Sequence, residues 1–395
     1  GNSLAEVSEP YCYVLDKTPV YFNIAQGDSA QEDGLTVIRV NKENKPQMGT
    51  ITVKKQGEVF STVAEKDGIY TPVYNMQGLE GAVFGVYALE DIFTPDKTLR
   101  YSAGEKVATL TTSADGIAVS QPLFLGKFEI REEKAPYGMV LLKEPIQTEL
   151  VYAGQQVEIT TVSVTAVNER QKAVISLLKK LETDEQYGIG LGSEYKNAKF
   201  GLYATEAIIA ADGTAIPKDG LIEIAGIDEN GMAVFSADIP VGAKIYVKEY
   251  ATDSHYLLSD TAYPVEFSYA DSSAAAVTIA VNDGEAIENE MIRGSVKGLK
   301  VDEDNNPVAG AVFGLFKADE TVFNADTALA AATSGEDGTF SFDSIPYGKW
   351  KIKELSCPEH LVLSEEITEV IISEKNQVVE ITAVNEIIPG RVEGV

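Results

Sequence analysis

Short runs in which apolar and polar residues alternate recur along the whole chain. Residues 49–55 (GTITVKK), 162–168 (VSVTAVN) and 379–385 (VEITAVN) are typical, and they are rich in Val, Ile and Thr. A period of two with β-branched residues is typical of half-buried strands. The pairs Asp115-Gly116, Asn230-Gly231 and Asp337-Gly338 predict turns that join antiparallel strands. The pattern predicts an all-β protein of tandem β-sandwich modules, with Ala-rich helical turns only near 204–211 and 322–332.

An internal repeat divides the chain. Three copies of one phrase occur, as GAVFGVY at 81–87, NAKFGLY at 197–203 and GAVFGLF at 310–316. Each unit closes on a strand that ends in asparagine, and a lysine follows 11 residues after the first three asparagines: Asn44 and Lys55, Asn168 and Lys179, Asn289 and Lys300, with Asn385 closing the last unit. A constant offset across variable loops indicates a fixed junction between modules.

These positions predict five segments in an elongated rod. They are the C-terminal part of a preceding module (1–48), three complete sandwich modules (49–172, 173–293 and 294–389) and the first strand of a following module (390–395). A related hypothesis is that residues 390–395 (GRVEGV) of a neighbouring molecule supply the opening strand to the partial module 1–48.

The opening strands place a lysine among apolar residues. Lys55 shares its face with Ile51 and Val53, because alternate residues of a strand point the same way. Lys179 shares a face with Ile175 and Leu177. In the third module the constant offset selects Lys300 over Lys297, although Gly298 stands where an aliphatic residue is expected.

Each module also offers a glutamate of buried parity, Glu132, Glu249 or Glu354, together with its terminal asparagine. Burial lowers the pKa of a lysine and raises that of a carboxyl group. A neutral amine can then attack the amide carbon of asparagine while a protonated carboxyl polarises its carbonyl and moves protons. Ammonia leaves and an amide cross-link remains. The alternative is an ordinary buried ion pair beside an asparagine at a strand end.

These residues resemble the SpaA/Cna B-type modules of Gram-positive pilins and adhesins. The resemblance rests on GSVKGLKVDEDNNPVAGAVFGLF (294–316), EEKAPYG (132–138) and the terminal asparagines. It implies prealbumin-like sandwiches with intramolecular Lys–Asn isopeptide bonds that an acidic residue assists. By position, the sets are Lys55, Glu132 and Asn168, then Lys179, Glu249 and Asn289, then Lys300, Glu354 and Asn385. The ExxAP pattern is intact only after Glu132, and Glu6 and Asn44 have no upstream lysine.

The composition of the chain excludes several classes of binding partner. The 395 residues carry 61 acidic and 32 basic side chains and a net charge of −29, so neither nucleic acid nor an anionic membrane is an expected partner. Two distant cysteines exclude a disulfide framework. No cofactor or metal is expected, because zinc-ligand spacings are missing and DEDNNP (302–307) is interpreted as a solvated turn rather than a calcium loop. Cys12 is interpreted as a plain loop cysteine rather than as the cysteine of a thioester.

The combined interpretation is a non-enzymatic, extracellular stalk of a cell-wall-anchored adhesin or pilus-like protein. No LPxTG-type sorting motif or leader is recognised in this segment, so anchoring to the wall would depend on a signal elsewhere. One alternative is a module that binds a host matrix protein or glycan, through the insertions at 56–80 or 182–197. Another is an accessory module of a secreted enzyme.

Overall fold

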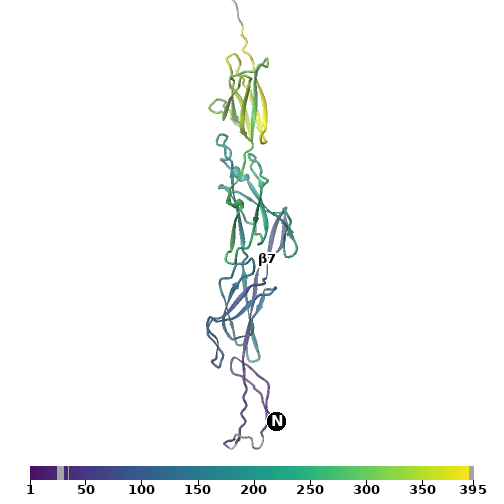
Figure 1. The fold of residues 1–395 in the computed structure, drawn as a ribbon, viewed down its shortest axis with the longest axis vertical. Helices are drawn as coiled ribbons and strands as arrows, with labels where there is room; N and C mark the ends of the chain where they lie inside the picture. The colour runs from purple at the N-terminus through teal and green to yellow at the C-terminus, as the bar shows by residue number, and fades with distance from the viewer. Residues whose placement is uncertain (25–30, 34, 391–395) are drawn as a thin grey trace, which may run out of the picture.

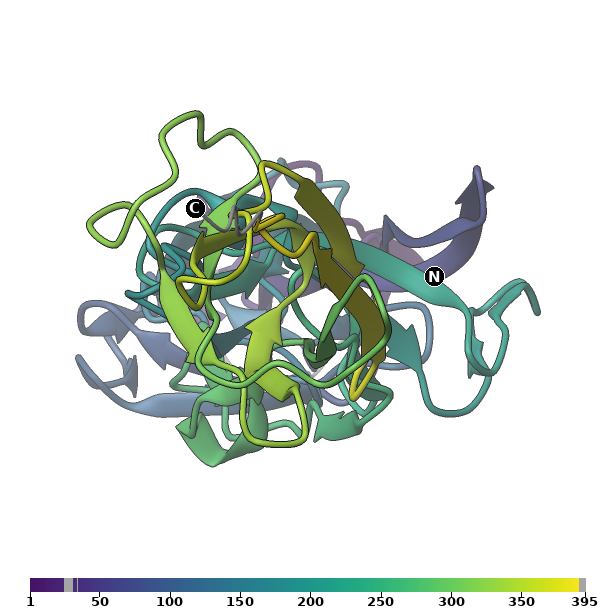
Figure 2. The ribbon, with the colours of Figure 1, turned by 90° about the horizontal axis from the view of Figure 1, so that it is seen from above.

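The computed structural model describes residues 1–24, 31–33 and 35–390. The modules follow one another along one long axis, with the N-terminal segment at one end and the last module at the other (Figure 1). Viewed along that axis they lie over one another (Figure 2). The predicted all-β fold of tandem sandwiches is confirmed. The strand predicted at 390–395 lies, beyond residue 390, outside the described residues.

The N-terminal segment contains only short strand pairs. Strand β1 pairs with β3, β2 with β6 and β4 with β5, all antiparallel. The strands are β1 (Asn2–Leu4), β2 (Tyr13–Val14), β3 (Val20–Phe22), β4 (Gln31–Glu32), β5 (Leu35–Thr36) and β6 (Lys45–Pro46).

The first complete module is a sandwich of two sheets. One sheet has the order β12-β9-β15-β16, and in the other β7 pairs with β13, β14 and β17. The strands are β7 (Met48–Lys66), β8 (Ile69–Gly78), β9 (Val83–Ala88), β10 (Ile92–Phe93), β11 (Leu99–Tyr101), β12 (Lys106–Thr111), β13 (Ile117–Val119), β14 (Leu123–Phe124), β15 (Gly126–Lys134), β16 (Ile146–Leu150) and β17 (Ile159–Asn168).

The second module repeats this plan with β22-β19-β24-β25 facing β23-β18-β26 and β27. Its elements are β18 (Lys172–Leu181), η1 (Glu194–Asn197), β19 (Lys199–Ala204), β20 (Ile208–Ile209), β21 (Ala215–Ile216), β22 (Leu221–Gly226), β23 (Met232–Phe235), β24 (Lys244–Ala251), β25 (Ala262–Glu266), β26 (Ala276–Ala280), η2 (Val281–Gly284) and β27 (Ile287–Asn289).

The third module is the simplest, with β30-β29-β32-β33 facing β31-β28-β34. Its strands are β28 (Arg293–Asp302), β29 (Val312–Lys317), β30 (Ala330–Thr333), β31 (Thr339–Pro346), β32 (Gly348–Ser356), β33 (Ile367–Ile372) and β34 (Val378–Asn385). Each module has its own apolar core, built around rings such as Phe84, Phe200 and Phe313.

Two local expectations were wrong. Residues 204–211 and 322–332 form no helix; strand β20 and the start of β30 occupy parts of them. The Asp-Gly and Asn-Gly turns do not close hairpins within one sheet. Each carries the chain from one sheet of its sandwich to the other, as Gly116 does between β12 and β13. No helix among the described residues is long and apolar enough to cross a membrane.

The two insertions considered as binding sites, 56–80 and 182–197, each contact the next module. Strands β7 and β8 continue as a hairpin beyond the first sandwich, and Ile69 of β8 pairs with Leu221 of β22 in the second (Figure 1). The hairpin side chains Phe60 and Val63 pack against the core of the second module. Likewise, Tyr187 from the 182–197 insertion is buried against Trp350 of the third module, with ring centroids 5.0 Å apart.

Candidate functional site

The opening and closing strands of each module pair in parallel, and in one register. Lys55 lies opposite Ala166, two residues before Asn168. The same two-residue step separates Ile287, opposite Lys179, from Asn289. In the third module Lys300 lies opposite Ala383, and Asn385 follows two residues later. A shared register thus brings each predicted lysine and asparagine to the same end of its sandwich.

The turn glycines support the lysines from the other side. The backbone N–H of each lysine donates to the carbonyl of its turn glycine at 2.7 Å: Lys55 to Gly116, Lys179 to Gly231 and Lys300 to Gly338. These glycines have φ of 78°, 81° and 74°, where a side chain is strained. A Cβ at Gly116 would also lie 2.3 Å from the Lys55 carbonyl oxygen. The turn glycines therefore help to fix the backbone of each lysine in place.

In the first module the three side chains meet in the core. Lys55 is 0% exposed, Glu132 7% and Asn168 3%. Lys55 Nζ lies 3.2 Å from Glu132 Oε1. Asn168 Nδ2 donates to Glu132 Oε2 at 2.7 Å, and the backbone N–H of Leu142 donates to the same oxygen at 2.7 Å. The carboxylate therefore faces both the amine and the amide nitrogen.

The second module brings its set together even more directly. Lys179 Nζ donates to Asn289 Oδ1, and Lys179 lies 3.7 Å from Glu249. Asn289 Nδ2 donates to both carboxylate oxygens of Glu249, at 2.8 and 2.9 Å, and to Thr252 Oγ1 at 3.1 Å. This geometry places the amine against the amide carbonyl that it would attack.

The third module has the widest spacing. Lys300 Nζ lies 4.0 Å from Glu354 Oε1 and donates to the backbone carbonyls of Val301 and Ala383 at 2.8 and 3.3 Å. Asn385 Nδ2 donates to Glu354 Oε2 at 2.9 Å. In all three modules the glutamate and asparagine are hydrogen-bonded while the lysine approaches from the neighbouring strand.

Two amide oxygens of these sets are buried without hydrogen-bond partners among the described residues. They are Asn168 Oδ1 and Asn385 Oδ1. Glu132 Oε1 and Glu354 Oε1 also lack a hydrogen bond of good geometry, but each lies within ion-pair distance of its lysine, at 3.2 and 4.0 Å. An unsatisfied buried polar atom costs about 1–3 kcal/mol. Natural proteins keep few such atoms, and those that remain call for a functional explanation. These oxygens belong to the first and third sets.

Burial lowers the pKa of all three lysines. Removal from water is the main cause for Lys55, Lys179 and Lys300, and the attraction of the neighbouring glutamate opposes it. For Lys179 the pKa falls to about 8. A lower pKa raises the fraction of neutral amine near neutral pH, which is the nucleophilic form.

Two junction glutamines were missed in the sequence. Gln47 and Gln171, three residues after Asn44 and Asn168, are 1% and 0% exposed. Gln171 Nε2 donates to the carbonyls of Asp271 and Ala274, and its Oε1 accepts from the N–H of Ala270. Gln47 binds the loop at 153–157 in the same way. Their identical offset from the asparagines was the available signal.

Arginines at two module junctions were also missed. Arg170 Nη2 lies 3.0 Å from Glu58 and 2.6 Å from Asp238, and its guanidinium lies 3.4 Å from the ring centroid of Tyr74. At the next junction Arg293 bridges Glu182 and Asp184 at 2.9 and 2.7 Å. The two arginines, which follow the closing strands β17 and β27, therefore tie the insertions to the neighbouring module.

Other sequence features lie apart from these sets. Cys12 and Cys357 are free thiols. Asp302 Oδ1 accepts from the N–H groups of Asp304 and Asn306, as expected for a turn. Among the described residues no cluster of His, Cys, Asp and Glu is arranged to hold a metal ion.

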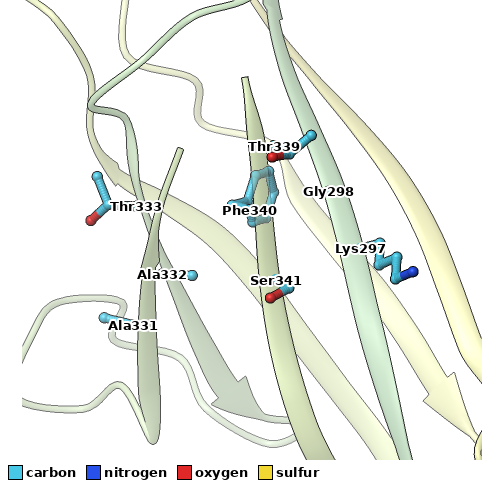
Figure 3. A pocket seen from close by; sticks show the side chains of 8 residues that line it. All are labelled: Lys297, Gly298, Ala331, Ala332, Thr333, Thr339, Phe340 and Ser341. Carbon is cyan, nitrogen blue, oxygen red and sulfur yellow. The ribbon is translucent and has the colours of Figure 1, made fainter. Parts of the chain in front are cut away.

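A hollow of about 530 Å³ lies on the third module, between β30 and β31 and beside β28. The ring of Phe340 lies next to Gly298 there (Figure 3). A Cβ at Gly298 would meet that ring at 2.1 Å, which explains the glycine where an aliphatic residue was expected. Lys297 is the one charged residue of the lining, so the hollow offers no acid–base pair.

The comparisons with known proteins agree with this architecture. The SpaA prealbumin-like fold domain matches residues 73–165 and 294–387. Both matched segments are SpaA-type domains. The segment at 294–387 spans the third set, and the one at 73–165 covers most of the first sandwich. The second module has the same paired sheets as its SpaA-type neighbours.

Among solved structures, the Bacillus anthracis TIE protein is similar with a TM-score of 0.58 and 21% identity, over 87% of this chain and 51% of that protein. The chain thus spans about half the length of that relative. The major pilin subunit BcpA of Bacillus cereus matches at 18% identity and TM-score 0.36, over 87% of this chain and 100% of that one. The major pilin SpaD of Corynebacterium diphtheriae matches at 15% identity and TM-score 0.24, over 87% and 98%. No curated protein matches the sequence.

Proposed function

We propose that this chain is a load-bearing stalk of a Gram-positive cell-surface adhesin or pilus-like protein, braced by self-formed Lys–Asn isopeptide bonds. The observation that supports the proposal is the threefold recurrence of a buried lysine on the first strand and a buried asparagine on the last strand of a module, with a buried glutamate beside them. The SpaA-type domains and the pilin neighbours are consistent with a structural role outside the cell.

The cross-link forms without a cofactor. The glutamate takes a proton from the lysine ammonium, and the neutral amine attacks the amide carbon of asparagine. The C–Nδ2 bond breaks, protons pass to the departing nitrogen through the carboxyl group, and ammonia leaves. An ammonium, a carboxylate and a primary amide thus become a secondary amide, a protonated carboxyl and ammonia. The hydrogen bond from Asn168 Nδ2 to Glu132 supports this role for the carboxyl group.

The bond would carry force around the module rather than through it. Force applied to the rod enters the first sandwich along β7 and leaves it after β17. A bond from Lys55 to Asn168 joins these strands where they lie parallel. The residues between them would then be shielded from extension. Without the bond, tension shears the backbone hydrogen bonds between β7 and β17.

The packed junctions complete the stalk. The β7–β8 hairpin and the 182–197 insertion each contact the following module, so adjacent sandwiches are joined by more than a linker. Inter-domain motion is the usual expectation where such contacts are small. These contacts favour a stiff rod over a set of modules joined by flexible linkers.

Binding of a host matrix protein or glycan is the second candidate. Most of the two insertions suggested for such binding is packed between modules. Exposed tips such as Glu65–Asp67 are the parts of them that a ligand could still reach. The main proposal includes two further points: the protein is anchored to the cell wall, and it has no catalytic role. An accessory module of a secreted enzyme finds no specific support in the site.

Single-molecule stretching between the two ends tests the stalk. We expect the three sandwiches of the unaltered chain to show no unfolding steps at forces that unfold the first sandwich of the Lys55→Ala variant. That variant should release the 112 residues between positions 55 and 168 (168 − 55 − 1), an extension of about 400 Å. Steps of that length in the unaltered chain would overturn the load-bearing proposal.

A further inference from the structure

The second module holds the amide of its asparagine with a side-chain hydroxyl group. Asn289 Nδ2, the nitrogen that leaves in the proposed reaction, donates to Thr252 Oγ1 at 3.1 Å as well as to both carboxylate oxygens of Glu249. At the other end of the amide, Asn289 Oδ1 accepts from Lys179 Nζ. Contacts on both sides of this planar group therefore hold its carbonyl toward the amine.

The other two sets hold their amides differently. In the first module the additional acceptor for Asn168 Nδ2 is the backbone carbonyl of Val140. In the third module Asn385 Nδ2 donates to Glu354 Oε2 at 2.9 Å. Both Asn168 Oδ1 and Asn385 Oδ1 have no hydrogen-bond partner among the described residues. Within the described structure, the amide beside the threonine hydroxyl is thus the one whose oxygen is bonded to its lysine.

Thr252 occupies a position that differs among the three modules. It lies three residues after Glu249 and directly after β24, and the same offset from the glutamates of the first and third modules gives Ala135 and Cys357. An alanine side chain has no hydrogen-bonding atom, and a thiol is only a weak acceptor. The hydroxyl group is therefore a property of the second module and not of the repeat.

Two further departures from the repeat support the turn that carries Thr252. Asp253 stands where the other two modules have proline, and Asn197 replaces the first glycine of the repeated phrase GAVFG. Asn197 Nδ2 donates to Asp253 Oδ2 at 2.7 Å, and the backbone N–H of His255 donates to Asp253 Oδ1 at 3.1 Å. Asp253 is 8% exposed. The two departures thus contact each other and hold the turn beside Asn289.

We propose that the hydroxyl group of Thr252 orients the amide of Asn289 for attack by Lys179, so that rapid formation of the second cross-link depends on it. This rests on the proposed function, because it assumes the same amide-forming chemistry. The hydroxyl group and Glu249 together bind the leaving nitrogen, which opposes rotation of the amide about its Cβ–Cγ bond. Without the hydroxyl group the carbonyl faces Lys179 in a smaller share of molecules, and the reaction slows in proportion.

The reaction leaves Thr252 unchanged. The Lys179 ammonium gives one proton to Glu249, and the neutral amine forms a bond to Cγ of Asn289. Glu249 protonates Nδ2, the Cγ–Nδ2 bond breaks and ammonia leaves, while a second proton passes from Lys179 Nζ to Glu249. The products are a secondary amide, a protonated carboxyl group and ammonia, so the threonine neither gains nor loses a proton.

The test follows all three cross-links of the full chain after a short pulse of cell-free synthesis. Samples are quenched in acid and digested, and mass spectrometry measures the fraction of each lysine peptide that is joined to its asparagine peptide. We expect Thr252→Val, which keeps the shape of the side chain but lacks the hydroxyl group, to slow the Lys179–Asn289 bond about 3–10-fold, as for the loss of one hydrogen bond. Thr252→Ser should restore the rate. Thr261→Val, at an exposed position of the same module, is the matched control.

The first and third cross-links are references within the same molecule. Their rates should not change in Thr252→Val, and the second cross-link should reach the same final yield as in the unaltered chain. Failure to reach that yield would mean that Thr252 is needed for folding, which contradicts the proposal. Equal rates in Thr252→Val and the unaltered chain, or a slow rate that Thr252→Ser does not restore, would also overturn it and leave the proposed function standing. If no module of the unaltered chain forms its cross-link, the proposed function fails as well.

Discussion

Glu132 Oε2 accepts a 2.7 Å hydrogen bond from Asn168 Nδ2, the nitrogen that must depart if the proposed cross-link forms. The carboxyl therefore stands at the leaving group as well as near the amine, with Lys55 Nζ 3.2 Å from its other oxygen. One residue can take the proton from the nucleophile and deliver one to the leaving nitrogen. Formation of the proposed cross-link therefore requires Glu132 in contact with both Lys55 and Asn168, and not only a buried lysine.

Glu132→Gln should leave the first module folded but without its cross-link. A glutamine keeps the size of the side chain and its hydrogen bonding but cannot carry protons between Lys55 and Asn168. We expect the mass of the variant to exceed that of the unaltered chain, beyond the substitution itself, by one ammonia. Glu133→Gln, a change at an exposed neighbour bonded to Lys106 and Tyr87, is the control and should retain the bond.

Loss of the cross-link should lower thermodynamic stability. For a closed loop of 113 residues (168 − 55), the constraint on the unfolded chain is worth about 4–5 kcal/mol if treated like a disulfide. Asn168→Ala removes the bond while it keeps the Lys55–Glu132 pair, so denaturant unfolding of the first module should shift by that order. Lys54→Ala, at an exposed position on the same strand, should not shift it. Equal stability of Asn168→Ala and the unaltered chain would contradict the account.

The second module without its bond should become more stable as the pH rises. In Asn289→Ala the free Lys179 has its pKa lowered to about 8 by burial, against an ordinary value of 10.5. The unfolded chain then binds more protons than the folded one between these values, so the free energy of unfolding increases across pH 8 to 10.5. The gain is about 3 kcal/mol. The unaltered chain should lack this rise, because an amide nitrogen does not titrate; unfolding curves across the window measure both.

Arg170→Ala should loosen the first junction. It removes the contacts to Glu58 and Asp238 and the stacking on Tyr74, a cost of about 1–2 kcal/mol given that both carboxylates are partly exposed. Small-angle scattering should then show a shorter and broader distribution of end-to-end distances. Lys172→Ala, whose more exposed ammonium lies 3.8 Å from Asp238, is the matched control. An unchanged profile for Arg170→Ala would mean that the hairpin alone fixes the junction.

The sequence predicted the fold class because strand alternation and the repeat are local signals. It also selected Lys300 over Lys297 by offset alone, and the structure buries the first and exposes the second. It could not predict that the β7–β8 hairpin reaches the second module, because the pairing of Ile69 with Leu221 depends on how the two modules pack together. The turn at Gly116 follows from its Asp-Gly pair, but the sequence does not show that its two strands belong to different sheets, since sheet membership depends on long-range pairing.

Gln47 and Gln171 illustrate the remaining difficulty. The sequence does not indicate whether a glutamine is buried. The role of Gln171 at the junction is visible only in the structure, where it bonds three backbone groups of a distant loop. The direction in which a carboxylate faces is likewise set by tertiary packing. The candidate residues could be listed from the chain, whereas their distances and orphaned oxygens could not.

The intact mass of the purified chain tests the central claim most directly. The account predicts a mass below that of the sequence by three ammonia molecules, with one restored by each of Lys55→Ala, Lys179→Ala and Lys300→Ala after correction for the substitution. Lys180→Ala, beside Lys179 but exposed, should restore none. A mass equal to that of the sequence would mean that the three sets are buried polar contacts only, and the braced stalk would be contradicted.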